Sequence, residues 1–222
     1  MNCRARWHAG REGRSTVANL AEKSSKKGKA KSAQNSRDLL IDTAARLFAS
    51  NGYTKTNMRE LAEAVGMKAG SIFYHFDRKE DILHAVMQQA ISYLLEAVRK
   101  DLAHAETPKE RLRVLVRLEL DLYLGEKSDH GFVMIHEWRS LSADQQADLM
   151  VMRAEFEPFW NSTLTNCYQQ GIIKADPKIV RRLLNGAFSW VPNWYEPSGE
   201  YSFEQLVDEV MAMLVGARDR SV

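Results

Sequence analysis

Residues 56–79 of the chain read TNMRELAEAVGMKAGSIFYHFDRK, and this stretch decides the fold. Its apolar residues fall on one face of a short helix that follows Thr56, which is predicted to be the N-cap. Gly66 then ends the helix, because glycine adopts a positive φ without steric cost. A second short helix is predicted to begin near Gly70 and to carry residues 71–75. The sequence thus predicts two short helices joined by a tight glycine turn.

A third helix follows the second directly. Asp77 is predicted to cap it, and Glu80 stands three residues later, as in a capping box. Two short helices joined by a tight turn form a helix-turn-helix, whose second helix has the dimensions to enter the major groove of DNA. The stretch therefore predicts DNA binding.

This pattern resembles the DNA-binding signature of the tetracycline-repressor (TetR) family. The residues in register with that signature are Thr56, Arg59, Leu61, Ala62, Val65, Gly66, Gly70, Tyr74, His75, Phe76, Lys79 and Leu83. The resemblance implies an all-α, homodimeric regulator. Its N-terminal head would bind an inverted-repeat operator, and a long helix would join the head to a ligand-binding body.

The predicted DNA contacts combine small, basic and aromatic residues: Thr56, Arg59, Lys68, Gly70, Ser71, Phe73, Tyr74, His75 and Lys79. Thr56 is expected to offer its hydroxyl to a phosphate at a helix N-terminus, where anions bind readily. The family resemblance implies phosphate contacts for Tyr74, His75 and Lys79. Phe73 is expected to touch a thymine methyl group. The alternative for the aromatic residues is core packing, and we favour it for Ile72 and Phe76.

The composition is that of a globular protein. Of 222 residues, 45% are apolar and 27% charged, with no apolar run long enough for a membrane span and no signal-peptide pattern. The two cysteines, Cys3 and Cys167, form no framework, so a reducing cytoplasm is expected.

The N-terminal segment is strongly basic. Ten lysine and arginine residues stand against two glutamates in residues 1–37. Residues 1–35 have no hydrophobic period and are predicted to be a disordered tail. One interpretation is an arm that adds phosphate contacts or reaches a minor groove. The alternative is an idle tail or a start placed too far upstream.

The remaining chain predicts helices throughout, and therefore an all-α fold. We expect the DNA-binding domain at residues 36–82, beginning with a helix at 36–50, and a helical effector-binding and dimerisation domain at 83–222. A long helix at 77–101 should connect them. The helices predicted in the body span residues 108–124, 132–140, 142–170 with a kink at Pro158, 177–190 and 202–216.

Catalytic and metal-binding motifs are missing from the sequence. It has no nucleophile elbow, phosphate loop or zinc-type cysteine pair, and no cofactor is expected. The spacing of His130 and His136 does not match a helical metal pair. Cys167 beside Tyr168 is interpreted as packing rather than redox sensing. We therefore expect no enzyme activity.

The body is rich in aromatic residues, which suit an apolar ligand pocket. The predicted effector-binding residues are Tyr123, Trp138, Arg139, Arg153, Phe156, Trp160, Trp190 and Trp194. The segments HEWRSL and RLLNGAFSWVPNWYEPSG resemble a branch of the family that responds to acyl-CoA thioesters. That resemblance implies CoA phosphate contacts for Arg139 and Arg153. The alternatives are core or interface packing for the aromatic residues and surface ion pairs for the arginines.

Together these features predict a homodimeric repressor released from its operator by a small apolar effector, such as an acyl-CoA. The dimer is expected to form through helices near 177–191 and 203–217, as a four-helix bundle. Two other classes stay open: an effector-independent architectural DNA-binding protein with the same head, and a divergent all-α enzyme.

Overall fold

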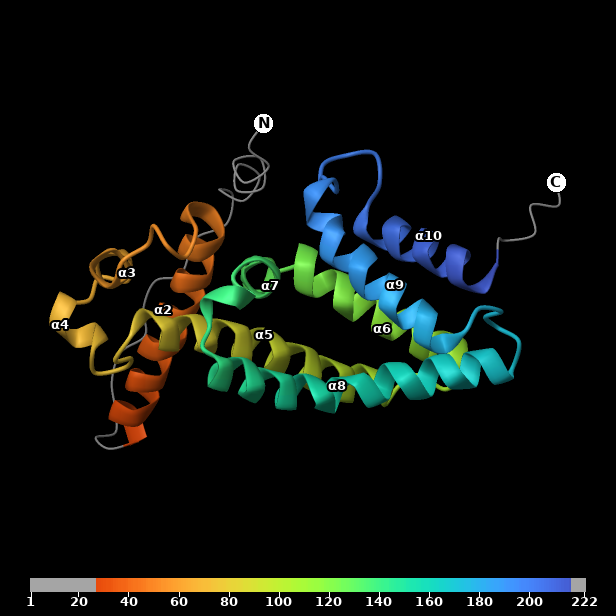
Figure 1. Cartoon of the computed structure of the whole chain (residues 1–222), viewed down its shortest axis with the longest axis horizontal. Coiled ribbons are helices and arrows are strands. Elements are labelled where there is room, and N and C mark those ends of the chain that lie inside the picture. The colour runs from red at the N-terminus through yellow and green to blue at the C-terminus, as the bar shows by residue number, and fades with distance from the viewer. Residues whose placement is uncertain (1–26, 217–222) are drawn as a thin grey trace.

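The structure, a computed structural model, describes residues 27–216, with the side chains of residues 35–216 apart from Ala69. Helices joined by turns make up this part of the chain, and no strand occurs within it. The all-α fold is confirmed. Figure 1 shows a small head at one end and an elongated helical body beside it.

Three helices form the head: α2 (Lys27–Asn51), α3 (Met58–Ala64) and α4 (Ala69–Ile72). Gly66 has a φ of 69° between α3 and α4, so the predicted glycine turn is confirmed. Leu61 of α3, Ile72 of α4 and Phe48 of α2 are all fully buried in the same hydrophobic core. The predicted helix-turn-helix is therefore present, and α2 supports it from beneath.

The first helix begins earlier than predicted. α2 starts at Lys27 rather than residue 36, so residues 27–35 of the predicted disordered tail are helical. Three lysines and two alanines lie in this part, and both residue types favour helices even without an apolar stripe. The prediction for residues 1–26 lies outside the described residues.

Both predicted caps in the head are wrong by one residue. Asn57, not Thr56, caps α3: its side chain accepts bonds from the N–H groups of Arg59 and Glu60, both at 3.0 Å. Arg78, not Asp77, precedes α5, and its N–H donates to Asp81 at 3.1 Å.

The second helix of the motif is shorter than predicted. α4 ends at Ile72, and Phe73 is its C-cap. Tyr74 and His75 therefore lie in the turn after the helix rather than on it. Their N–H groups donate to the carbonyl oxygens of Ser71 and Ile72, so the turn keeps the helical direction.

A long helix joins head and body. α5 (Lys79–Leu102) runs from the helix-turn-helix along the whole body, beside α8 (Ala143–Gln169) (Figure 1). Its apolar residues are buried along its length, as predicted for a connecting rod. The proposed domain boundary between residues 82 and 83 stays a prediction, because α5 crosses it without a break.

The rest of the body consists of α6 (Pro108–Leu124), α7 (Ser128–His136), the short 3₁₀ helix η1 (Trp138–Ser140), α8, α9 (Pro177–Trp190), the 3₁₀ helix η2 (Val191–Asn193) and α10 (Phe203–Val215). The capping boxes predicted at Thr107 and Ser202 are confirmed, since each side chain accepts a bond from the N–H three residues later.

Two body helices differ from the sequence prediction. The helix expected at 132–140 begins at Ser128, ends at His136 and continues as η1. The second is α8, which Pro158 does not interrupt. The kink expected at Pro158 stays a prediction. Pro158 is exposed, so water can reach the carbonyl that lacks its helical donor.

Candidate DNA interface and effector pocket

The exposed surface of α4 and its flanking turns carries most of the predicted DNA contacts. Phe73 is 54% exposed and Tyr74 82%, whereas Ile72 and Phe76 are buried. The two exposed residues are thus among the predicted DNA contacts, and the two buried ones are those predicted to pack in the core. The neighbouring predicted contacts Lys68, Gly70 and Ser71 are also exposed. Large apolar rings on a surface indicate an interaction site.

Two further predicted contacts flank this surface. Arg59 on α3 is exposed and forms an ion pair with Glu63 at 3.0 Å, one helical turn away. Because this pair is solvated, its net energy is small and Arg59 can exchange Glu63 for a phosphate. His75 is half-buried, with its ring edge-on to Tyr74 at 5.2 Å between centroids.

Thr56 and Lys79 point into the head instead of toward solvent. The Thr56 hydroxyl donates to the carbonyl of Gly52 at 3.0 Å, and the residue is 1% exposed. The Lys79 ammonium donates to the carbonyl oxygens of Tyr53 and Thr56, both at 2.8 Å. Burial lowers the pKa of Lys79. Because their polar atoms already have protein partners, this arrangement argues against phosphate contacts for both side chains, which stay predictions.

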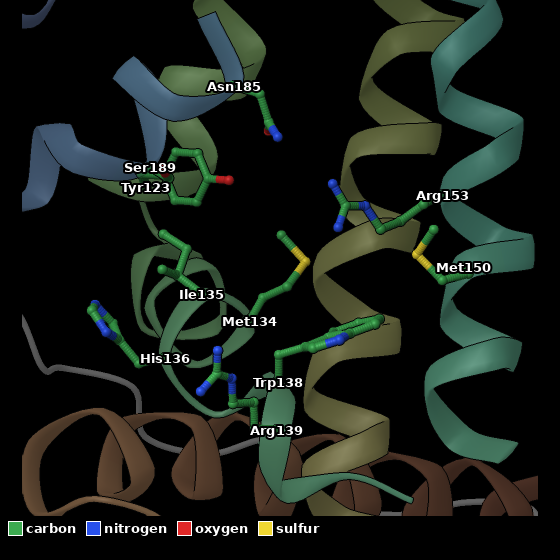
Figure 2. Close-up of a pocket in the computed structure, with 10 residues that line it drawn as sticks. All are labelled: Tyr123, Met134, Ile135, His136, Trp138, Arg139, Met150, Arg153, Asn185 and Ser189. Carbon is green, nitrogen blue, oxygen red and sulfur yellow. The ribbon is translucent and has the colours of Figure 1, made fainter. Parts of the chain in front are cut away.

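A pocket of about 420 Å³ opens between α6, α7, η1, α8 and α9 (Figure 2). It brings together half of the predicted effector residues: Tyr123, Trp138, Arg139 and Arg153. Sequence reasoning missed the other lining residues, which are Met134, Ile135, His136, Met150, Asn185 and Ser189. Their polar and apolar types are mixed, and only the tertiary arrangement brings these residues of α7, α8 and α9 around one pocket.

A second, much smaller cavity of about 20 Å³ lies deeper. It shares Tyr123, Met134, Arg153 and Asn185 with the outer pocket. Phe156 lines only this inner cavity, with Ile91 and Leu94. A volume of this size holds about one water molecule. The inner cavity therefore extends the pocket by very little.

Charged residues form one wall of the inner cavity. Arg181 on α9 bonds to Glu119 on α6 and to Glu157 on α8, each at 2.9 Å. Burial raises the pKa of the Glu119 carboxyl, while Arg181 opposes that shift. Both carboxylates are thus engaged by one guanidinium, which ties α6, α8 and α9 together.

Three predicted effector residues lie outside the pocket. Trp160 is fully buried and packs between Phe188 and the guanidinium of Arg181, whose carbon lies 4.7 Å from the ring centroid. Trp190 is 64% exposed and Trp194 52%. The structure therefore argues against effector contacts for these three, because Trp160 lies in the core and the other two face outward.

The wall of the pocket also contacts the head. Glu137, between α7 and η1, accepts a bond from the N–H of Tyr53 at 3.2 Å. Lys127, just before α7, donates to Asp42 of α2 at 2.6 Å. The segment that supplies Met134 to Arg139 to the pocket is therefore bonded to the head at both ends.

Exposed apolar residues collect on α9, η2 and α10 and the connection between them. The largest are Ile179, Leu183, Trp190, Trp194, Tyr201 and Met213, exposed by 49% to 85%. Such a surface indicates a protein interface.

The described residues contain no cluster of histidine, cysteine and acidic side chains that fits a metal ion. None of the helices described between residues 27 and 216 is long and apolar enough to cross a membrane.

A helix-turn-helix head with exposed contact residues, joined by one helix to a body with a ligand-sized pocket, defines a DNA-binding regulator with a sensing domain. The chain belongs to the TetR family: the model for bacterial regulatory proteins of the tetR family matches residues 40–86, and that for the tetracyclin repressor-like C-terminal domain matches residues 105–217. It is thus a ligand-responsive, DNA-binding transcriptional repressor.

Similar proteins match more than four fifths of the chain. The HTH-type transcriptional repressor KstR2 of Mycolicibacterium smegmatis is 28% identical over 191 residues, which cover 83% of this chain and 91% of KstR2. The superantigen PfiT, known from a crystal structure, is 38% identical to this chain in sequence, and its fold matches with a TM-score of 0.72. The match covers 83% of this chain and 98% of PfiT. AibR in complex with isovaleryl coenzyme A and operator DNA is 27% identical, with a TM-score of 0.74, covering 82% and 100%.

Proposed function

We propose that the protein represses transcription as a homodimer and leaves its operator when a CoA thioester binds the outer pocket. The observation that carries this proposal is the pocket of about 420 Å³, which combines apolar side chains with Arg139 and Arg153. Its volume lies in the range of small-ligand sites, about 300–1,000 Å³. The likeness to AibR, solved with isovaleryl coenzyme A and operator DNA, supports the same ligand class.

The proposed DNA contacts are the exposed and half-exposed residues of the head: Arg59, Lys68, Gly70, Ser71, Phe73, Tyr74 and His75. The proposed dimer forms through α9 and α10, where the exposed apolar residues lie. Two copies would then present their heads to an inverted repeat whose half-sites are about one helical turn of DNA apart. We place this activity in the cytoplasm, and catalysis has no part in it.

The proposed switch acts through the segment from α7 to η1. This segment lines the pocket with Met134, Ile135, Trp138 and Arg139, and Glu137 within it bonds to the head. A ligand between α7 and α8 would move this segment and thereby tilt the head. A hundredfold loss of operator affinity needs only about 2.7 kcal/mol of coupling, which is within the ordinary allosteric range.

The test begins with selecting the preferred DNA sequence from a random pool. The purified dimer on that labelled DNA is then titrated with acyl-CoAs of graded length, the matching free acids and CoA alone. Thioesters should release the DNA, and by reciprocity the operator should weaken thioester binding by the same factor. Release by an unrelated ligand, with no thioester binding, would contradict the ligand class but leave the repressor. If none of the compounds binds the protein or releases the DNA, the result would favour the alternative of an effector-independent, architectural DNA-binding protein.

A further inference from the structure

Three polar side chains point into one space at the inner end of the pocket. Figure 2 shows the Tyr123 hydroxyl, the Asn185 amide and the Arg153 guanidinium directed toward one another across it. They come from α6, α9 and α8, so three separate helices converge there. Within the part of the chain that the structure describes, none of the three makes a hydrogen bond or ion pair.

The three side chains differ in exposure, and Asn185 is the exposed one. Tyr123 is only 4% exposed, and burial raises the pKa of its hydroxyl, which therefore keeps its proton and acts as a donor. Arg153 is half-buried and always charged. Three donors that come from separate helices, converge on one cavity and have no protein acceptor among the described residues can together bind one ligand acceptor.

The neighbouring carboxylates do not supply that acceptor. Glu119 and Glu157 are both bonded to Arg181. Arg153 makes no bond to Glu119. Its positive charge nevertheless helps to lower the pKa of the Glu119 carboxyl, against the effect of burial. Its guanidinium fork is therefore left for another oxygen group.

The two arginines of the pocket also occupy different places. Arg153 lines both cavities, whereas Arg139 lines only the outer one and is exposed. In Figure 2, Arg139 lies at the opposite end of the pocket from Asn185. A thioester whose CoA part enters from the Arg139 side would therefore bring the far end of its acyl chain to Arg153. The inner cavity, at about 20 Å³, has no room for a longer chain.

We infer that the effector's acyl group is short and ends in an oxygen acceptor, a carboxylate or a ketone, which Arg153, Tyr123 and Asn185 bind. This inference rests on the proposed function and assigns Arg153 to the acyl end instead of the CoA phosphates. The residue determines specificity, because an apolar acyl end of the same shape would leave all three polar groups unpaired.

The experiment compares three CoA thioesters whose acyl groups have the same number of non-hydrogen atoms and nearly the same shape: glutaryl-CoA, 5-oxohexanoyl-CoA and 5-methylhexanoyl-CoA. Binding to the full-length dimer is measured by calorimetry and by release of labelled operator. At least one oxygenated thioester should bind about tenfold more tightly than the apolar one. The oxygenated thioester that binds more tightly then identifies the end group as a carboxylate or a ketone.

Two variants then assign the preference. Arg153→Met keeps the length of the side chain and should remove the preference, mainly by weakening the oxygenated ligand. Arg139→Met is the matched control: it should weaken all three thioesters by a similar factor and leave their ratio unchanged. Tyr123→Phe should reduce the preference in part. Thermal unfolding verifies that each variant is folded.

The outcomes separate this inference from the function on which it rests. Equal or tighter binding of 5-methylhexanoyl-CoA, or an Arg153→Met variant that keeps the preference, would overturn the inference and leave the thioester-responsive repressor intact. Binding of no thioester at all would overturn both.

Discussion

The ammonium group of Lys79 lies 2.8 Å from two backbone carbonyl oxygens and 4.1 Å from the ring centroid of Tyr53. It fastens the loop between α2 and α3 to the start of α5. Sequence matching placed Lys79 among the phosphate contacts, yet the residue type alone cannot distinguish a charge offered to DNA from one that satisfies carbonyls. Lys68 is the opposite case, since its side chain is exposed and no carboxylate lies within ion-pair distance in the described residues.

Lys79→Ala should therefore weaken DNA binding by destabilising the head. We expect a lower unfolding temperature and weaker operator binding, with the slope of log affinity against log salt unchanged. Lys68→Ala should keep the unfolding temperature and reduce that slope by about one, as for loss of a phosphate contact. Thermal unfolding and salt titrations of operator binding measure both effects. A reduced slope with unchanged stability for Lys79→Ala would restore it to the DNA contacts.

Gly70 gives a second test at the residue scale. A Cβ built at Gly70 meets nothing within 4 Å, so Gly70→Ala should be folded and at least as stable as the wild type. We expect it to lose operator affinity, because the methyl group would lie between α4 and the groove. Gly66→Ala is the control for stability: its φ of 69° should make that substitution cost about 1 kcal/mol. Unaltered operator affinity of Gly70→Ala would mean that α4 approaches DNA from another side.

At the scale of the elements, the segment from α7 to η1 connects the pocket to the head. Its bonds to the head come from Glu137 to Tyr53 and from Lys127 to Asp42. The ligand is thus expected to act on this segment as well as on the long rod α5. The sequence prediction placed the end of this segment at Ser140 correctly but missed its start at Ser128, because no side-chain cap marks that start.

Glu137→Gln tests this connection. Loss of the charge weakens the bond to the Tyr53 N–H but keeps a possible acceptor, so folding should be preserved. We expect operator and thioester each to bind nearly as in the wild type, while the factor by which one weakens the other falls. That factor is obtained by measuring operator affinity with and without the thioester, and thioester affinity with and without the operator. Glu155→Gln, which breaks an exposed pair with Arg99 between α8 and α5, should leave it unchanged.

The elements also show how far sequence reasoning reaches. Helices with side-chain caps were predicted almost to the residue, as at Thr107 and Ser202, because a cap is a local interaction. The effector site was predicted only in part. Aromatic residue type suggested Trp160 and Trp190, but burial of one and exposure of the other depend on which helix faces are covered. Which helix faces are covered cannot be predicted from the sequence around either residue.

At the scale of the whole molecule, α9 and α10 present exposed apolar residues that no element among residues 27–216 covers. Leu183 is 68% exposed on α9 and Met213 85% on α10. A single head reads one half-site, so specific operator binding requires that two heads be held at a fixed spacing. Burial of this face between two copies would both remove the apolar surface from water and set that spacing.

Leu183→Glu should therefore yield a folded monomer, because a buried carboxylate on each side of a symmetric interface lacks a partner. The matched control is Val151→Glu, at a residue of α8 that is also 68% exposed and lies outside the proposed face. Light scattering should report a monomer for Leu183→Glu and a dimer for the control. Operator affinity should fall to the level of non-specific DNA for Leu183→Glu alone, while its thioester affinity is retained, since the pocket is built within one chain. A dimeric Leu183→Glu protein with full operator affinity would place the interface elsewhere.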